Sequence, residues 1–118
     1  MRIGLMSDTH KKLGRAKKAV DLLMDKGIEF LVHAGDIVRE ELLEYIESKG
    51  LRYVAVLGNN DFHLYSVVDK YELVTEPFYF IFQCWKIISQ NIFYYGKFYP
   101  FIVMSNKISN TVCSFCIV

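Results

Sequence analysis

The chain has 118 residues, which is enough for one domain and short for two. Its formal net charge is +1, so no strong overall field favours nucleic acid or an acidic membrane surface. We also expect no signal peptide and no transmembrane helix, because polar residues interrupt every apolar run before it reaches bilayer length. The composition therefore predicts neither a membrane partner nor nucleic-acid specificity.

The cysteine content indicates the redox environment. The three cysteines are Cys84, Cys113 and Cys116, all late in the chain. An odd number argues against a disulfide framework and fits a reducing compartment. We therefore expect a cytoplasmic protein.

Strand-like and helix-like patterns alternate through the first half of the chain. In chain order we predict a strand over Arg2–Met6, a helix over Leu13–Lys26, a strand over Phe30–His33, a helix over Val38–Lys49 and a strand over Tyr53–Leu57. Apolar residues recur at helical spacing in both helices, and a glycine follows each of them. The alternation predicts an α/β fold with β-α-β units and a parallel sheet. The almost continuously apolar strands predict burial of both sheet faces.

The two halves of the chain differ in composition. All 13 acidic residues lie within residues 1–76, whereas residues 77–118 contain most of the phenylalanines and no Asp or Glu. The apolar residues of this tail follow neither a strand nor a helix period. The tail is either a strand-rich half of the domain or sequence never selected to fold, such as a frameshift product, and we favour the second interpretation. We therefore assign residues 1–76 to the domain and residues 77–118 to an atypical, poorly folding tail.

Three polar clusters directly follow the predicted strands. They are Ser7-Asp8-Thr9-His10, Ala34-Gly35-Asp36 and Gly58-Asn59-Asn60-Asp61. Ligands of an open parallel sheet bind outside the carboxyl ends of its strands, so we expect the clusters to meet at one edge. Asp8 and His10 are two residues apart, which places their side chains on the same side of an extended chain. The sequence thus predicts a divalent-metal site built from distant segments.

The residue types fit a site that holds a phosphoryl group between two cations. Asp8 and His10 can bind one metal, the Asp36 carboxylate can bridge two, and Asn59 offers a neutral oxygen to the second. Two ions about 3.5–4 Å apart polarise a phosphoryl group and lower the pKa of a shared water. Structural interpretations stay open: Asp8 and Asp36 can cap helices, and the Gly58–Asp61 cluster can be a turn that tolerates positive φ.

These motifs resemble those of the calcineurin-like metallophosphoesterase superfamily, and in particular its small YfcE-type phosphodiesterases. The resemblance covers residues 1–76 and rests on Asp8-x-His10, Gly35-Asp36 and Gly58-Asn59-x-Asp61. It implies that the β-α-β-α-β segment is the parallel half of an α/β sandwich. It further implies hydrolysis of phosphoester bonds in small molecules, above all phosphodiesters, by metal-activated hydroxide.

The resemblance also implies residue roles around two ions of manganese, nickel or a similar divalent metal. Asp8 and His10 would bind the first ion, Asp36 would bridge, and Asn59 would bind the second. The catalytic candidates are Asn60 and Asp61, which would lie near the substrate phosphate or orient their neighbours.

The family pattern continues with His-Gly and Gly-His-x-His motifs that supply further histidine ligands. This chain has no histidine after His63. We therefore expect a truncated version of the enzyme that holds one metal or fewer well. The alternative is a non-catalytic pseudoenzyme or scaffold that binds at most one metal weakly.

The remaining histidines and a basic cluster have structural as well as functional interpretations. His33 lies within a predicted strand, and we expect a hydrogen-bonded, partly buried residue rather than a ligand. His63 follows Asn59 closely, but nothing else in its surroundings supports it as a ligand. The basic cluster at the start of the first helix is either an electropositive approach for phosphate or, more simply, a solvated face; it consists of Lys11, Lys12, Arg15, Lys17 and Lys18.

Overall fold

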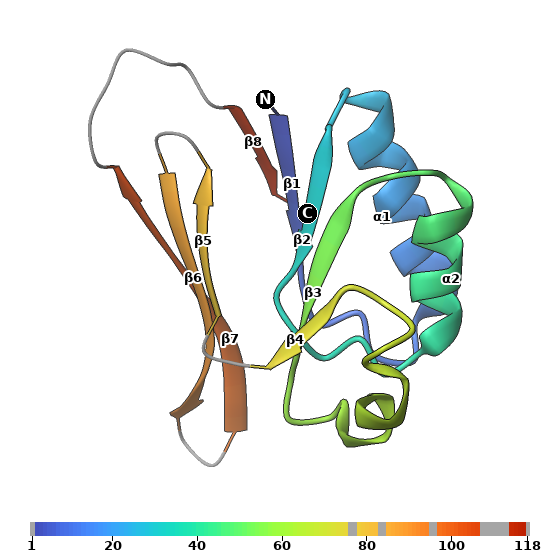
Figure 1. The fold of residues 1–118 in the computed structure, drawn as a ribbon, viewed down its shortest axis with the longest axis vertical. Helices are drawn as coiled ribbons and strands as arrows, with labels where there is room; N and C mark the ends of the chain where they lie inside the picture. The colour runs from blue at the N-terminus through green and yellow to red at the C-terminus, as the bar shows by residue number, and fades with distance from the viewer. Residues whose placement is uncertain (1, 76–77, 83–84, 95–96, 107–113, 118) are drawn as a thin grey trace.

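The computed structural model describes residues 2–75, and the backbone of residues 78–82, 85–94, 97–106 and 114–117 (Figure 1). Its first part consists of β1 (Arg2–Met6), α1 (Leu13–Asp25), β2 (Phe30–His33), α2 (Glu40–Ser48), β3 (Tyr53–Leu57), the 3-10 helix η1 (Phe62–Val67) and β4 (Leu73–Thr75). Its second part consists of β5 (Phe78–Phe82), β6 (Trp85–Tyr94), β7 (Lys97–Asn106) and β8 (Ser114–Ile117).

Five strands form a parallel sheet in the order β4-β3-β2-β1-β8. Helices α1 and α2 cover one face of this sheet, and the antiparallel sheet β5-β6-β7 lies beyond the other face (Figure 1). The predicted α/β fold with a parallel β-α-β-α-β half is therefore confirmed.

Strands β5 to β8 fall in the segment that the sequence marks as an atypical tail. The separate status of residues 77–118 stays a prediction, and the cysteine side chains lie outside the described residues. Within the part of the chain that the structure describes, no helix has the length and apolar character needed to cross a membrane.

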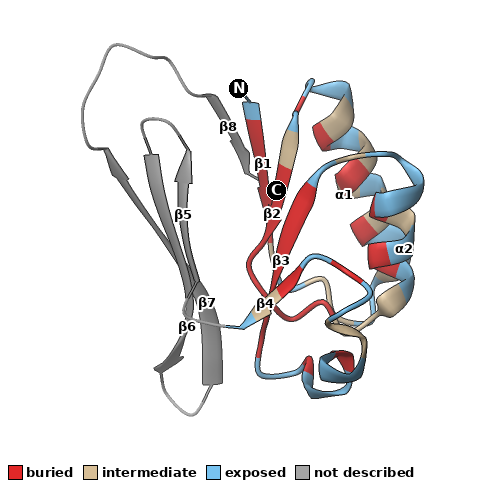
Figure 2. Cartoon of the chain, in the orientation of Figure 1, coloured by how far each residue is buried: buried red, intermediate tan, exposed pale blue. Residues whose placement is uncertain are grey.

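The central strands are buried on both faces, as their apolar runs predict (Figure 2). On the helical side, apolar residues of α1 and α2 pack against the sheet; they include Val20, Leu23, Leu42, Leu43 and Ile46. The opposite face carries a second cluster of Ile3, Leu5, Val32 and Val54. Each fully buried Leu, Ile or Val stabilises the fold by about 1.5–3 kcal/mol. This packing fixes the strands so that the carboxyl ends of β1, β2 and β3 share one edge.

Helix α2 begins at Glu40, two residues later than predicted. Val38 has a φ of 62°, a left-handed conformation that a β-branched residue rarely adopts. Its amide donates a hydrogen bond to Asp61 Oδ1 at 2.7 Å. A right-handed helix cannot include a residue in that conformation. The segment between β2 and α2 therefore belongs to the edge of the sheet and not to the helix.

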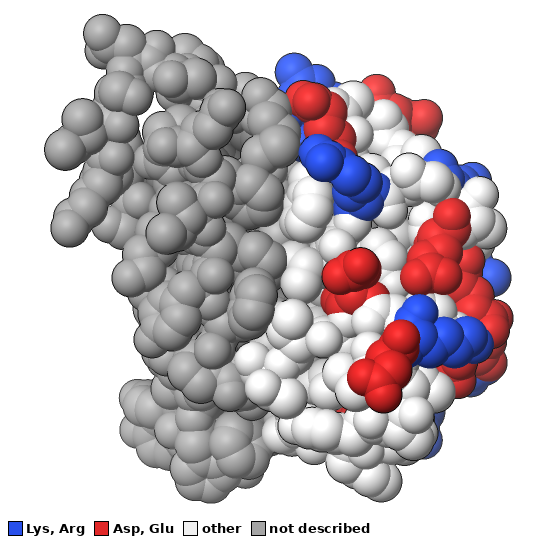
Figure 3. All heavy atoms as spheres, in the orientation of Figure 1, with Lys and Arg blue, Asp and Glu red and all other residues white. Residues whose placement is uncertain are grey.

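The helical side of the surface carries both signs of charge (Figure 3). Lys70 Nζ lies 2.8 Å from Glu40 Oε1, and Lys49 Nζ lies 3.0 Å from Asp21 Oδ1. Such exposed pairs contribute about 0–1 kcal/mol each. The acidic residues of α2 thus form a solvated, partly paired face.

Candidate metal centre

Three polar side chains meet at the carboxyl ends of β1 and β2. Asp8 and His10 lie on the loop after β1, and Asp36 lies on the loop after β2. One donor atom from each residue lies within 4.8 Å of the other two. His10 Nε2 is 3.6 Å from Asp8 Oδ1 and 3.8 Å from Asp36 Oδ2. The structure therefore gathers two carboxylates and one imidazole at the sheet edge.

The backbone that orients these side chains is not an extended strand. Asp8, His10 and Asp36 have φ values of 54°, 45° and 57°. The expectation that extended-chain alternation aligns Asp8 with His10 is therefore wrong, because two left-handed residues turn the loop instead. Residues other than glycine in this region cost on the order of 1–3 kcal/mol each and concentrate at active sites and ligand clamps. The left-handed loops thus make this edge a candidate functional site.

Backbone contacts between the two loops hold this conformation. The Asp8 amide donates to the Gly35 carbonyl oxygen at 3.0 Å, and the His10 amide donates to the Asp36 carbonyl oxygen at 2.9 Å. The loop after β1 is therefore tied to the loop after β2 at the residues that carry the polar side chains.

Neither carboxylate caps a helix. The N-cap residues are Lys12 for α1 and Arg39 for α2, and neither helix has a side-chain capping bond. Asp36 instead accepts two hydrogen bonds from Asn60, from its amide N to Oδ1 at 3.1 Å and from its Nδ2 to Oδ2 at 2.8 Å. The helix-cap interpretation of Asp8 and Asp36 is therefore excluded.

The donor set fits a divalent cation. Asp36 is only 3% exposed, and burying a carboxylate is unfavourable unless a cation or strong donors compensate its charge. Within residues 2–75, the only basic side chain whose nitrogen lies within 4.0 Å of either carboxylate is that of His10. Two carboxylates and an imidazole suit Mn²⁺, Zn²⁺ and similar ions. The side chains present therefore fit a metal at this position.

Asp61 joins the loop after β2 to the loop after β3. Its side chain is fully buried. The carboxylate accepts hydrogen bonds from the amides of Ile37 at 3.1 Å, Val38 at 2.7 Å and Gly58 at 2.8 Å. Three amide donors compensate the buried charge. Asp61 thus has the geometry of a positioning residue that fixes the segment carrying Asp36.

Gly58 lets Asp36 approach the loop after β3, and Gly58→Ala is expected to disturb both stability and the candidate metal centre. A Cβ at Gly58 would collide with the carboxylate and the amide nitrogen of Asp36. We expect the free energy of unfolding to fall by about 1–3 kcal/mol, the usual range for overpacking, and Mn²⁺ affinity to fall with it.

Urea unfolding and a Mn²⁺ titration would measure these effects. Gly14→Ala in α1 is the matched control, since nothing lies within 4 Å of a Cβ there and alanine favours a helix. Equal stability and equal Mn²⁺ affinity of the two variants would contradict the close approach of Asp36 to Gly58.

Asn59 and Asn60 form an exposed turn directly after β3. Neither has a positive φ, so tolerance of left-handed backbone does not explain this turn. Asn60 contacts Asp36 through both hydrogen bonds described above. The metal-binding role of Asn59 stays a prediction.

His33 lies beneath the loop that carries Asp8 and His10. Its ring is buried, with 1% exposed, and Nδ1 accepts a hydrogen bond from the Gly35 amide at 3.3 Å. The ring proton is therefore assigned to Nε2, which donates to Thr9 Oγ1 at 3.0 Å. His33 supports the site loops from below, with both ring nitrogens bonded.

Acid is expected to destabilise the fold through His33. Burial, reinforced by the charge of His10, lowers the pKa of His33 to about 3. An unfolded histidine has a pKa of about 6.5, so the unfolded chain takes up the proton first. The contribution of His33 to the free energy of unfolding is complete above about pH 6.5 and is lost progressively toward pH 3. At pH 5 the loss amounts to roughly 2 kcal/mol.

Urea unfolding in chelator at pH 7 and pH 5 would test this linkage. Between pH 7 and pH 5, the free energy of unfolding of His33→Gln should fall by about 2 kcal/mol less than that of the parent chain. An identical loss in the parent chain and in His33→Gln would show that His33 does not carry the effect.

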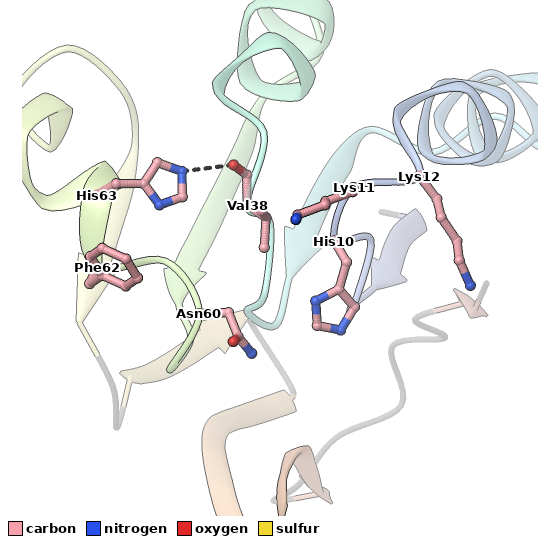
Figure 4. A pocket seen from close by; sticks show the side chains of 7 residues that line it. All are labelled: His10, Lys11, Lys12, Val38, Asn60, Phe62 and His63. Atoms are coloured by element: carbon pink, nitrogen blue, oxygen red, sulfur yellow. Dashed lines mark hydrogen bonds between the residues drawn. The ribbon is translucent and has the colours of Figure 1, made fainter.

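A cleft of about 530 Å³ opens beside the candidate metal centre (Figure 4). Its lining includes His10, Lys11, Lys12, Asn60, Phe62 and His63. His63 Nε2 lies 2.7 Å from the Val38 carbonyl oxygen and donates a hydrogen bond to it. Phe62 was not predicted from the sequence, since a single aromatic residue after a polar cluster gives no sequence signal of its own. The cleft extends the site beyond the predicted ligands.

The basic cluster at the start of α1 divides into different environments. Lys11 and Lys12 line the cleft. Lys17 Nζ instead lies 4.9 Å from the centre of the Tyr45 ring, and Lys18 is exposed and does not line the cleft. Only part of the cluster therefore faces the site.

The strained, acid-rich edge of this α/β sheet is the arrangement expected of metal-dependent phosphoesterases. Residues 1–91 match the calcineurin-like phosphoesterase superfamily domain, and the chain belongs to this superfamily. Among curated proteins, the phosphodiesterase MJ0936 of Methanocaldococcus jannaschii is 38% identical over 61 residues, which are 52% of this chain and 37% of that protein. The chain thus spans little more than a third of the length of this curated relative. No solved structure matches the chain.

Proposed function

We propose that the chain is a metal-dependent phosphoesterase that hydrolyses phosphodiester bonds of small molecules. The observation that carries this proposal is the convergence of Asp8, His10 and Asp36 within 4.8 Å on strained loops of a superfamily member. The match with a phosphodiesterase supports the diester preference. The motif spacing supports a place near the small YfcE-type phosphodiesterases.

Asp8, His10 and Asp36 would hold the first ion, with manganese and nickel as the leading candidates. Asp36 would also bridge to a second ion, to which Asn59 would offer its amide oxygen. When bound, such ions act as Lewis acids on phosphoryl oxygens and lower the pKa of a bound water toward neutrality. The exposed Asp8 and His10 side chains leave this position accessible from solvent, with 39% and 43% exposed.

The neighbouring residues would set the geometry of this centre. Asn60 fixes both oxygens of Asp36, and the second hydrogen of its side-chain amide is available to a phosphoryl oxygen in the cleft. Asp61 would act as a positioning residue through its three amide donors. We further propose a cytoplasmic location, which the odd number of cysteines supports.

Hydrolysis of a chromogenic phosphodiester with Mn²⁺ and with chelator would test the proposal. We expect a Mn²⁺-dependent rate that Asp36→Asn lowers by at least 100-fold. The variant would bind the metal poorly and so lose the stabilisation that the metal gives to the transition state. Asp25→Asn makes the same chemical change at an exposed position outside the site and should retain the parent rate. Equal background rates in every sample would instead favour a non-catalytic scaffold.

A further inference from the structure

We propose that the cleft beside the candidate metal centre selects phosphate esters that carry an aromatic ring. The ring would stack on Phe62, and Lys11 would pair with the phosphate. This inference rests on the proposed function and names the substrate class of the same site.

Phe62 is the most exposed large apolar residue in the part of the chain described with side chains, at 77%. An exposed apolar residue alone needs no explanation. Phe62, however, lines the same cleft as His10 and Asn60. Its ring centre lies 5.7 Å from that of His63, and the two rings cross at 78°. The cleft therefore has an aromatic wall close to the side chains that would handle phosphate.

Positive charge faces this aromatic wall across the cleft. Lys11 extends between His10 and Val38, whereas Lys12 runs along the far side of His10 (Figure 4). Within residues 2–75, Lys11 is exposed and forms no ion pair, so its ammonium group is available to an anion. The cleft thus combines a cation suited to phosphate with a surface suited to a flat ring.

The size of the cleft matches a small ring-bearing ester. Its volume of about 530 Å³ lies within the roughly 300–1,000 Å³ typical of small-molecule sites. A phosphate held near His10 and Asn60 would direct an ester arm toward Phe62 on the opposite wall. A nucleobase and a simple aryl group share this chemistry, because each presents a flat π-face.

NMR titrations with four ligands would test the inference. The ligands are phenyl phosphate, adenosine 5′-monophosphate, ribose 5-phosphate and inorganic phosphate. Each is titrated into the full chain with Mg²⁺ and again in chelator. We expect the two ring-bearing ligands to bind about 5- to 150-fold more tightly than the two ringless ones, the range expected for one stacked ring.

Matched variants would separate the aromatic and the cationic contributions. Phe62→Ala should abolish the preference for ring-bearing ligands. Tyr65→Ala removes another aromatic residue of η1, which is 52% exposed and lies outside the cleft, and this variant should retain the preference. Lys11→Ala should weaken the binding of all four ligands, whereas Lys18→Ala should leave their affinities unchanged. Tighter binding of the nucleotide than of phenyl phosphate would assign the site to nucleoside esters, and equal binding would assign it to aryl rings in general.

Equal affinity for ring-bearing and ringless phosphates, or no binding of either, would overturn the inference. Because these titrations measure binding without turnover, they are independent of the hydrolysis assay. A ring preference without Mn²⁺-dependent hydrolysis would overturn the proposed function alone. Hydrolysis without a ring preference would overturn this inference alone.

Discussion

Replacing Asp36 with asparagine is expected to lower the Mn²⁺ affinity of the chain by more than about 100-fold. Losing a residue that only orients a ligand already costs about 10–100-fold in affinity, and Asp36 is itself a proposed ligand. Asparagine keeps the shape of the side chain but removes its charge. The other two candidate ligands of the first ion, Asp8 and His10, are two-fifths exposed and would hold that ion poorly by themselves. Titration of Mn²⁺ monitored by electron paramagnetic resonance would measure the change.

Two controls make this result specific. Asp25→Asn removes one negative charge from the exposed end of α1 and should leave Mn²⁺ affinity unchanged. Unfolding in urea should show that Asp36→Asn is still folded. Unchanged Mn²⁺ affinity in a folded Asp36→Asn variant would remove Asp36 from the proposed ligand set.

Replacing Asp61 with alanine is expected to lower the free energy of unfolding by roughly 3–5 kcal/mol. The substitution leaves three amides without their acceptor: those of Ile37 and Gly58, which are buried, and that of Val38, which is half-buried. A hydrogen bond to a charged group contributes about 1.5–3 kcal/mol, and each buried donor left unpaired costs about 1–3 kcal/mol. Urea unfolding would measure the loss.

The same change should weaken Mn²⁺ binding, because Asp61 fixes the segment that carries Asp36. Asp61→Asn retains one carbonyl oxygen as an acceptor. Its stability and its Mn²⁺ affinity should therefore lie between those of the parent and the alanine variant. Asp69→Ala, at an exposed aspartate, should change stability by less than about 0.5 kcal/mol. A loss for Asp61→Ala no larger than that for Asp69→Ala would show that the buried carboxylate does not hold the loops.

Much of the parallel half could be predicted because its strands carry two strong signals. Continuous apolar runs gave the bounds of β1, β2 and β3, and glycines after the helices indicated where each helix stops. Strand β4 is only three residues long and has no flanking signal, so periodicity could not find it. The start of α2 was misplaced because Val38 fits the apolar pattern of a helix, whereas Asp61, distant in sequence, holds it in a left-handed conformation.

The convergence of Asp8, His10 and Asp36 followed from a rule of topology: polar residues after parallel strands meet at the same sheet edge. The backbone that brings them together could not be predicted, because nothing in the sequence marks three non-glycine residues as left-handed. The bond between His33 and Thr9 depends equally on tertiary contacts. The sequence therefore identifies which side chains gather, and the structure shows what holds them there.

Anomalous diffraction from crystals grown with Mn²⁺ would show whether Asp8, His10 and Asp36 together bind a metal ion. We expect a strong manganese peak bounded by the carboxylates of Asp8 and Asp36 and the imidazole of His10. A well-ordered structure with these side chains in place, saturated with Mn²⁺ but with no peak among them, would contradict it.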